Sequence, residues 1–349
     1  MIKKERLIGK TLDELKDVAS RVSLPGYAAK QIADWIYKNR ATTIREMTNI
    51  ALSKRELLEQ TYTLGFAPPI QTVRSTDGTV KYLFATAEQN YFIESVWIPS
   101  KDRATLCVSS QAGCRMNCVY CWTGKQGFAA HLTANEMMNQ ILSTAENKEL
   151  TNIVFMGMGE PLDNIDEVLK TLEIMTAPYG FGWSPKRITV SSIGILPGLR
   201  RFLEESDCQL AISLHSPYHD ERSSLMPIEK VYPIQSIIDL LHKYDFSHQR
   251  RVSFEYILFD GVNDTERHAS DLAHLLRGIT CRVNLIRYHA VPDVPLYSCS
   301  DKTMEQFKNR LNARQITCTI RTSRGEDVYA ACGMLSGKKQ GDPSPRQFL

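Results

Sequence analysis

Three cysteines lie close together in the stretch Cys114-Arg-Met-Asn-Cys118-Val-Tyr-Cys121, so that one loop presents three thiols. Thiolates are soft ligands that suit iron–sulfur clusters, Zn²⁺ and Cu(I). A structural zinc site takes four protein ligands, and no other CxxC pair or CxxxH pattern lies near this loop to supply the fourth. The spacing therefore favours a [4Fe–4S] cluster that leaves one iron open for a small chelating ligand. A structural zinc knuckle is the alternative.

Two motifs further along the chain carry groups suited to a small polar ligand. In Gly157-Met-Gly159-Glu160-Pro, the glycines let the backbone approach a ligand closely, and the carboxylate of Glu160 can accept hydrogen bonds from an ammonium group. In Ser213-Leu-His215, the imidazole could act as a general base or as a polar ligand contact. In isolation, such a histidine is more often a hydrogen-bonded core residue.

The cysteine count also bears on the chemistry. Nine cysteines, in a chain with no visible export signal, argue against a disulfide framework and for metal or redox chemistry. Cys208, Cys281 and Cys318 lie in or beside apolar strands, where a free cysteine behaves as a small hydrophobic residue. Cys107 differs, because it precedes the cysteine loop on a predicted strand. Cys332 is expected in a loop.

From about residue 103 the chain alternates apolar strands with amphipathic helices, which predicts parallel βα units with right-handed crossovers. Strands are predicted at residues 104–109, 152–156, 187–191, 209–214, 252–258, 283–287 and 317–321. Helices are predicted to begin near Thr133, Asn164, Pro197, Pro233, Asp264 and Asp301. The fold class is therefore α/β, with an open or partial TIM-like (βα)6 barrel.

The candidate residues follow the ends of different predicted strands. The cysteine loop follows the first strand and the glycine motif the second, Ser191 ends the third, Ser213 to His215 end the fourth, His289 follows the sixth, and Cys332 follows the last. Functional groups in parallel barrels gather at the carboxyl ends of the strands. The order of the motifs therefore predicts a single active site on one rim.

Different patterns flank the barrel, which is predicted to span residues 101–335. Residues 1–65 indicate a small helical module that is basic on one side and suited to docking a substrate, although a solvated helix face is the more common explanation of such charges. Residues 66–100 alternate as an antiparallel hairpin region, where Glu94 on its own would be expected to face solvent. Residues 336–349 are predicted to be a flexible tail.

Together these motifs resemble the RlmN/Cfr family of radical S-adenosylmethionine (SAM) RNA adenine methyltransferases. The similarity rests on Cys107-Val-Ser-Ser-Gln-Ala-Gly-Cys114 with the cysteine loop, Phe155-Met-Gly-Met-Gly-Glu160-Pro-Leu162, Ile212-Ser-Leu-His215 and Ala330-Ala-Cys332-Gly333. It spans nearly the whole chain, including the helical module. The resemblance implies a [4Fe–4S] cluster on Cys114, Cys118 and Cys121, and two SAM molecules per turnover.

The resemblance also implies roles for single residues. One SAM methylates the thiol of Cys332, and a second is cleaved to a 5′-deoxyadenosyl radical that takes a hydrogen from this methyl group. The methylene radical adds to an adenine carbon, and Cys107 then forms a disulfide with Cys332 as the methylated base leaves. Glu94 matches the proton acceptor. The implied SAM contacts are Gly159, Glu160, Ser191, Ser213, Leu214, His215 and, where the family usually has asparagine, His289.

Sequence features of two branches of the family are present. Glu160-Pro-Leu162 and Arg321-Thr-Ser-Arg-Gly-Glu-Asp327 resemble the branch that methylates adenine C2. His215-Ser-Pro-Tyr218 and Ser223-Ser-Leu-Met226-Pro resemble the branch that methylates C8 and confers resistance to ribosomal antibiotics. We favour C2, with 23S rRNA near the peptidyl transferase centre and the adenosine beside the anticodon of some tRNAs as substrates. A non-catalytic zinc/RNA-binding module and a radical SAM activase are the rival classes, and neither needs Cys332.

Composition sets the remaining limits. Hydrophobic residues make up 43% and charged residues 23% of the 349 residues, and a net charge of +3 is too small to indicate a nucleic-acid partner by itself. No apolar run approaches the roughly 18 residues of a membrane span, and the basic N-terminus is not followed by the apolar segment of a signal peptide. We expect a cytoplasmic monomer without a membrane partner. Its electron donor is expected to be a protein such as flavodoxin or ferredoxin.

Overall fold

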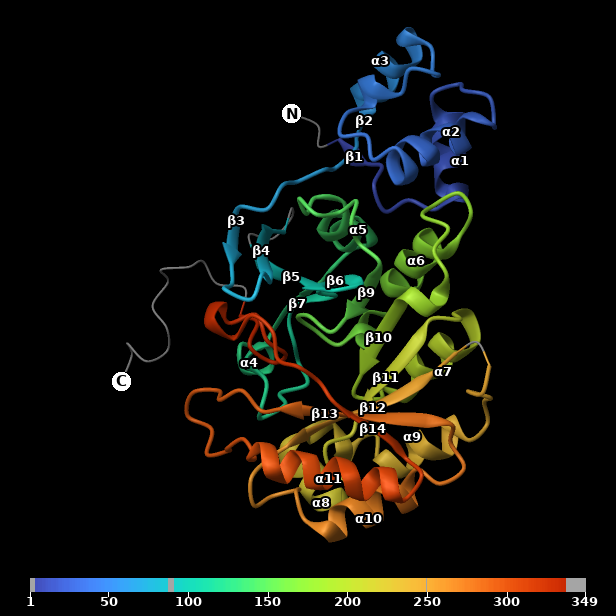
Figure 1. Ribbon diagram of the computed structural model, residues 1–349. Coiled ribbons are helices and arrows are strands. Elements are labelled where there is room, and N and C mark those ends of the chain that lie inside the picture. Colours follow the sequence, from blue (N-terminus) through green and yellow to red (C-terminus); the bar gives the residue numbers. More distant parts are fainter. Residues whose placement is uncertain (1–3, 87–90, 249, 337–349) are drawn as a thin grey trace.

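The computed structural model describes residues 4–86, 91–248 and 250–336. A ten-stranded sheet runs through the barrel in the order β14-β13-β12-β11-β10-β9-β6-β5-β4-β3 (Figure 1). Its parallel strands are β6 (Arg103–Cys107), β9 (Asn152–Phe155), β10 (Ile188–Ser192), β11 (Gln209–Ser213), β12 (Val252–Leu258), β13 (Cys281–Arg287) and β14 (Thr317–Ile320). Within the described residues, β3 and β14 end the sheet without pairing with each other, so the barrel is open.

All seven predicted parallel strands are confirmed, with boundaries within two residues of those expected. Their apolar character follows from burial on both faces, because helices cover one face of the sheet and the barrel interior lies on the other. Val190, Leu210 and Phe254, on three neighbouring strands, are at most 1% exposed. The strands therefore hold their carboxyl ends at fixed positions around one rim.

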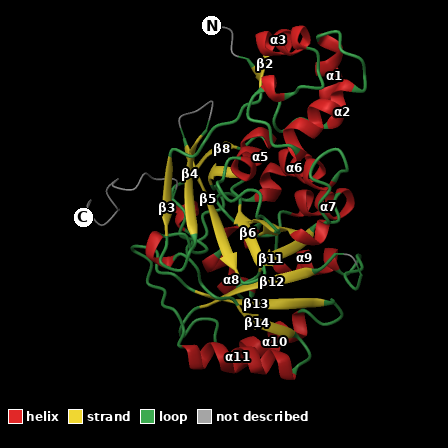
Figure 2. Ribbon diagram, turned by 45° about the horizontal axis from the view of Figure 1, so that its top comes forward, coloured by secondary structure: helices red, strands yellow, loops and turns green. Residues whose placement is uncertain are grey.

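The helices lie on the outer side of the sheet (Figure 2). The six predicted ones are α5 (Ala134–Leu142), α6 (Ile165–Thr176), α7 (Leu196–Glu205), α9 (Ile234–Leu241), α10 (Glu266–Leu275) and α11 (Asp301–Ala313). Thr133 begins α5 with a capping box that includes Glu136, as its sequence indicates. Two short helices, α4 (Trp122–Lys125) and α8 (His219–Leu225), were not predicted. Single 3₁₀ turns are η3 (Pro161–Asn164), η4 (Pro185–Arg187), η5 (Pro227–Lys230) and η6 (Glu326–Val328).

The N-terminal segment folds into a helical module above the barrel (Figure 1). It consists of β1 (Glu5–Arg6), α1 (Leu12–Arg21), α2 (Ala28–Ala33), the π-helical turn η1 (Asp34–Lys38), the 3₁₀ turn η2 (Ile44–Glu46), α3 (Leu52–Thr61) and β2 (Tyr62–Thr63), which pairs in parallel with β1. The module contacts α5 and α6: Asn135 Nδ2 donates to the carbonyl of Ile8 at 3.0 Å, and Lys170 Nζ lies 2.6 Å from a Glu14 carboxylate oxygen. None of the described helices is long and apolar enough to cross a membrane.

The expected hairpin region forms three antiparallel strands that continue the main sheet. They are β3 (Gln71–Arg74), β4 (Val80–Ala85) and β5 (Phe92–Ser100), and β5 pairs antiparallel with β6. Val96 on β5 lies opposite Cys107 on β6, and side chains alternate along a strand, so Glu94 shares the face of Cys107. The side chain of Glu94 is buried rather than solvent-facing.

Residues 321–336, here called the C-terminal strap, run from the end of β14 to the turn between β3 and β4, at the other end of the sheet (Figure 1). The Asp327 carboxylate accepts hydrogen bonds from Ser75 Oγ at 2.5 Å and from Thr76 N at 3.0 Å. The N–H of Gly325 donates to Asp77 Oδ2 at 3.0 Å. Of the predicted tail at residues 336–349, all but Ser336 lie outside the described residues.

Candidate active site

The cysteine loop lies between β7 (Gln111–Gly113) and α4, and β8 (Phe128–His131) pairs antiparallel with β7 behind it. Cys114 and Cys118 are buried, and Cys121 is partly buried. Burial raises the pKa of the Cys114 thiol to about 12, so this thiol is protonated at neutral pH until a metal binds and displaces its proton.

The spacing of these thiols distinguishes two kinds of metal centre. In a mononuclear tetrahedral site with Zn–S bonds near 2.3 Å, the sulfur atoms lie about 3.8 Å apart. Among the described residues, one group of three His, Cys, Asp or Glu side chains has its ligand atoms within 4.8 Å of one another, namely Asp260, Asp264 and Cys299. The three loop thiols are thus further apart than a zinc knuckle requires. A cluster in which each thiolate binds a different iron does not require the thiols to lie this close, and the assignment of these thiols to such a cluster stays a prediction.

A cavity at the carboxyl ends of the strands brings together most of the predicted site residues. Those that line it are Cys114, Cys118, Cys121, Gly159, Glu160, Ser191, Ser213, His215 and Cys332. They come from the ends of β9, β10 and β11, from the cysteine loop and from the strap. In the structure these motifs therefore lie together on one rim, as predicted.

Glu160 is held rigidly at this rim. Its two carboxylate oxygens accept backbone N–H groups of Leu162 and Ile193, each at 3.0 Å. Burial raises its pKa to about 7, although these hydrogen bonds act in the opposite direction. A cationic ligand group beside the carboxylate would favour its ionised form.

The glycine at position 159 is required by the fold itself. Its φ is +98°, and a Cβ there would lie 2.4 Å from the Cβ of Gln111. A Cβ on Gly157 would lie 2.7 Å from Ser109 Oγ. Close packing against the segment after β6 therefore explains both glycines. The contact of Gly159 with SAM stays a prediction.

His215 is buried and neutral. Its Nδ1 accepts the backbone N–H of Ile257 at 2.9 Å, so the remaining proton lies on Nε2. Burial, assisted by the positive charge of Arg222, lowers the pKa of His215 to about 3. The side chain is thus suited to donate a hydrogen bond to a ligand and poorly suited to act as a general base.

Besides Cys107, three predicted residues do not line this cavity. Leu214 is fully buried, and its N–H donates to the carbonyl of Glu255 at 3.0 Å. His289 Nε2 lies 3.0 Å from Ser323 Oγ in the strap. Glu94 accepts the N–H of Ser336 at 2.7 Å. The predicted roles of these three residues stay predictions.

A second cavity lies beside the first and contains Cys107, His289 and Cys332. Both cavities are lined by Cys332 and Arg321, together with Met156, Ile286 and Leu335. Burial, with a smaller effect of the nearby Cys332, raises the pKa of the Cys107 thiol to about 12. Cys332 itself is exposed. The strap therefore places Cys332 where the two cavities meet.

Sequence reasoning missed a buried carboxylate in the first cavity. Glu255 on β12 accepts from Ser253 Oγ at 3.0 Å and Asn284 Nδ2 at 2.8 Å, and Arg321 Nη1 lies 3.2 Å from its other oxygen. A charged residue inside the apolar strand Val252–Leu258 was the available signal.

Sequence reasoning also missed Arg222 on α8, because that helix was not predicted. This guanidinium is fully buried and forms an ion pair with Glu229. It donates to the carbonyls of Ile193, Ser213 and Leu214 at 3.0 to 3.1 Å. Arg222 thus fixes the backbone at the ends of β10 and β11.

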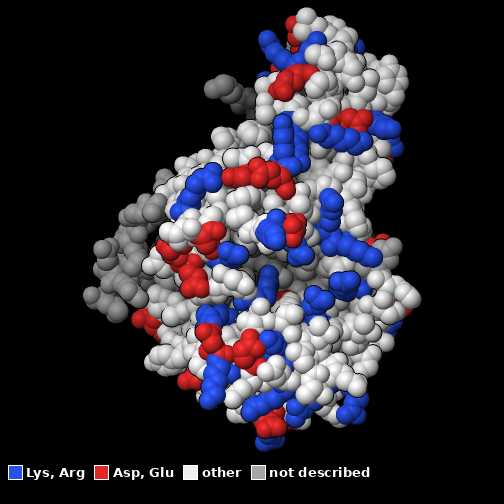
Figure 3. Space-filling model, viewed as in Figure 1, with Lys and Arg blue, Asp and Glu red and all other residues white. Residues whose placement is uncertain are grey.

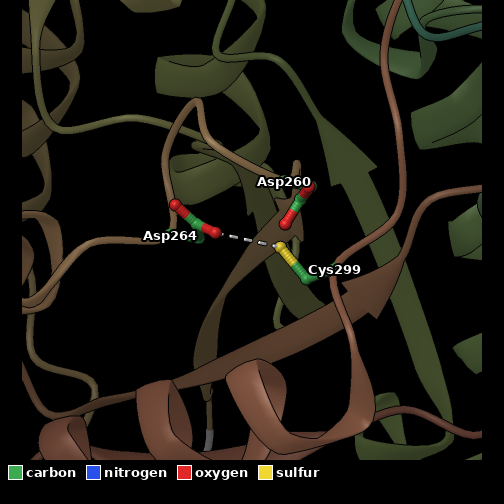
Figure 4. A group of neighbouring side chains, drawn as sticks. All are labelled: Asp260, Asp264 and Cys299. Atoms are coloured by element: carbon green, nitrogen blue, oxygen red, sulfur yellow. Dashed lines mark hydrogen bonds between the residues drawn. The ribbon is translucent and has the colours of Figure 1, made fainter.

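A group of three side chains, drawn in Figure 4, lines neither cavity: Asp260, Asp264 and Cys299. Cys299 Sγ lies 3.5 Å from Asp264 Oδ2, which in turn accepts the N–H of Gly261 at 3.2 Å. These contacts fix the loop after β12 against the segment before α11.

Two family descriptions match the chain. "Radical SAM superfamily" matches residues 108–273, and "Ribosomal RNA large subunit methyltransferase N-terminal domain" matches residues 6–64.

Relatives and a solved structure match almost the whole chain. A "Probable dual-specificity RNA methyltransferase RlmN" of Parabacteroides distasonis is 63% identical, over 97% of this chain and 98% of the relative. The "Dual-specificity RNA methyltransferase RlmN" of Syntrophus aciditrophicus is 40% identical, over 94% and 95%. The crystal structure of a radical SAM methyltransferase from Sphaerobacter thermophilus superposes with a TM-score of 0.90 at 39% identity, covering 96% of this chain and all of that one. The chain therefore belongs to the RlmN family of dual-specificity RNA methyltransferases, within the radical SAM superfamily.

Proposed function

We propose that this protein methylates C2 of an adenosine in 23S rRNA near the peptidyl transferase centre, and of the adenosine beside the anticodon in certain tRNAs. Its relatives are named dual-specificity RNA methyltransferases, which supports RNA substrates of two kinds. The observation that carries the proposal is the position of Cys332 at the junction of the two cavities. A thiol placed there can receive a methyl group from one side and deliver it to a base on the other.

In this proposal, Cys114, Cys118 and Cys121 hold the cluster, and the polar groups beside them hold SAM. Glu160 accepts from the SAM ammonium group, and His215 donates from Nε2, because its Nδ1 is already occupied by Ile257. When bound, the cluster and a second SAM would supply the one-electron cleavage that removes a hydrogen atom from the methyl group on Cys332. Two SAM molecules are thus consumed per methylated base.

The remaining steps belong to residues of this chain. Cys332 carries the methyl group and links it to the adenine carbon. Glu94 accepts the proton that leaves that carbon, and the unpaired electron of the adduct would pass to the cluster. The Cys107 thiol then gives up its proton as its sulfur bonds to the sulfur of Cys332. This breaks the bond from Cys332 to the methyl carbon, and that carbon takes a proton to complete the methyl group of the released base. The resulting disulfide must be reduced before the next turnover.

RNA recognition in this proposal combines the helical module with the barrel. Figure 3 shows lysine and arginine side chains spread over both parts on the face viewed, with acidic side chains among them. Such a surface suits phosphate contacts that position the RNA, while the target adenosine leaves its stack to enter the second cavity. Residues 1–65 would dock the RNA, and a cytoplasmic flavodoxin or ferredoxin would supply electrons.

Mass spectrometry of 23S rRNA and tRNA from a deletion strain complemented with this protein tests the proposal. The expected product is 2-methyladenosine in both RNAs, and its absence with Cys332→Ala. Formation of 8-methyladenosine would keep the route through Cys332 but overturn C2. No methyladenosine from protein with an intact cluster would reject the methyltransferase and favour an activase.

A further inference from the structure

Tyr329, in the strap, has a backbone conformation that a bulky residue rarely adopts. Its φ and ψ are 53° and 43°, in the left-handed region that favours glycine or asparagine. The turn is held by its neighbours: Ala330 N donates to the carbonyl of Gly325 at 2.8 Å, and Asp327 is anchored on Thr76. A strained conformation that the surroundings enforce is a common feature of functional sites.

The side chain of Tyr329 lies in solvent, one residue before the segment that lines the second cavity. It is 62% exposed, and among the described residues neither its ring nor its hydroxyl has a partner. Its backbone is held: the N–H donates to the carbonyl of Glu326 at 3.2 Å, and the carbonyl accepts from Lys81 Nζ at 3.5 Å. The next residues, Ala330 and Ala331, are buried and line the cavity that contains Cys332. The strap thus exposes one aromatic ring immediately before the segment that carries the reactive thiol.

We propose that Tyr329 is a stacking platform for an unpaired RNA base that flanks the methylated adenosine. This inference rests on the proposed function. An adenosine that leaves its stack exposes the faces of its neighbours, and an aromatic side chain can bind such a face whatever the base. Arg324 lines the second cavity. Its side chain is 38% exposed, and its Nη1 lies 3.9 Å from Asp77 Oδ2, so its exposed part offers a positive charge to the adjoining phosphate.

The backbone conformation contributes to this role. Because the neighbouring residues fix the turn, the Cα–Cβ bond of Tyr329 has a fixed direction before RNA arrives. A side chain on a fixed backbone loses less conformational entropy on binding than the same side chain on a flexible loop. Asparagine tolerates the same left-handed backbone and has no ring. Tyr329→Asn therefore removes the ring without imposing a new strain.

The test uses a 23S rRNA fragment with 2-aminopurine next to the target adenosine. Binding to the wild-type protein and to Tyr329→Phe should quench the fluorescence through stacking, whereas Tyr329→Asn should leave it unquenched. The KM for RNA should rise about 5- to 150-fold in Tyr329→Asn, which is a stacking term of 1–3 kcal/mol converted at 1.36 kcal/mol per factor of ten. Tyr297→Asn is the matched control, since Tyr297 is 70% exposed elsewhere.

A second readout separates stacking from a structural role. Methylation of the Cys332 thiol by SAM, without RNA, requires the strap geometry but no RNA contact, so Tyr329→Asn should retain it. Loss of this methylation, or quenching by Tyr329→Asn equal to that of the wild type, would overturn the stacking role. If the wild-type protein methylates no RNA, the proposed function itself fails and the stacking role falls with it.

Discussion

Lys81 and Glu94 form an ion pair across two neighbouring antiparallel strands, with Nζ 3.0 Å from Oε1, and their side chains are only 14% and 1% exposed. The second carboxylate oxygen accepts the N–H of Ser336. Glu94 therefore joins β4, β5 and the strap at one point. A carboxylate fixed in this way is held at a constant position relative to the segment that carries Cys332.

We expect Glu94→Gln to reduce RNA methylation at least about 100-fold, because general acid–base groups contribute 10²- to 10⁴-fold. Glutamine can still accept from Ser336 but cannot take a proton, so methylation of the Cys332 thiol should persist. Single-turnover assays of the two steps measure this split. Glu305→Gln, which breaks a surface pair with Lys308, is the control. Equal loss in both steps would indicate a structural role for Glu94.

Alkylation should distinguish Cys107 from Cys332. Thiolate is the reactive form of cysteine, and burial raises the pKa of Cys107 to about 12. Its reaction with iodoacetamide should therefore be slow at neutral pH and accelerate as the pH rises toward that value, whereas the exposed Cys332 reacts first. Peptide mass spectrometry of protein alkylated at several pH values measures both rates. Labelling of Cys107 as fast as Cys332 at neutral pH would contradict this.

Arg222→Met should destabilise the fold strongly. The change leaves Glu229 buried without its ion-pair partner, a loss that costs about 3–5 kcal/mol. It also removes the hydrogen bonds to the carbonyls of Ser213 and Ile193, so SAM affinity should fall in the protein that remains folded. Urea unfolding measures the first effect and SAM titration the second. Arg201→Ala, at an exposed pair with Asp166, should change neither, since surface pairs contribute little.

Iron content should depend on the cysteine loop alone. Reconstituted protein is expected to be brown and to bind about four iron atoms per chain, whereas Cys118→Ala should lose the colour and most of the iron. Cys299→Ala should keep both, because Cys299 lies outside the two cavities. Metal analysis by mass spectrometry settles the comparison. One zinc ion per chain in the wild-type protein, with no iron, would support the zinc-knuckle alternative.

The parallel strands and their rim were predictable because burial on both faces leaves a strong signal. Each strand is a short apolar run, and each motif follows one, so topology alone places the motifs together. Cys332 was expected at the rim on the same reasoning. The cysteine loop was identified by the spacing of its three cysteines, because only a few spacings let one loop present three thiolates to one metal centre.

What could not be predicted depends on contacts between distant segments. Glu94 was expected on its own to face solvent, because nothing in its strand indicates the partners Lys81 and Ser336. The short helix α8 carries no strong apolar period, so the position of Arg222 beneath two strand ends was invisible. Around Cys332 the sequence predicted only a loop. The path of the strap could not be predicted, because it depends on the contact of Asp327 with the turn at Thr76, which is far away in the sequence.

The route of the strap has a consequence for how the protein is made. The cysteine loop needs only eight consecutive residues to present its three thiols, and the chain reaches it early in synthesis. Cys332 reaches the rim only after residues 325–327 contact the turn at residues 75–77. This contact joins segments that are far apart in the sequence, and such contacts form late. We expect the cluster site to exist before the thiol arrives. The order of synthesis thus keeps the three loop thiols and the thiol of Cys332 apart until the strap has folded.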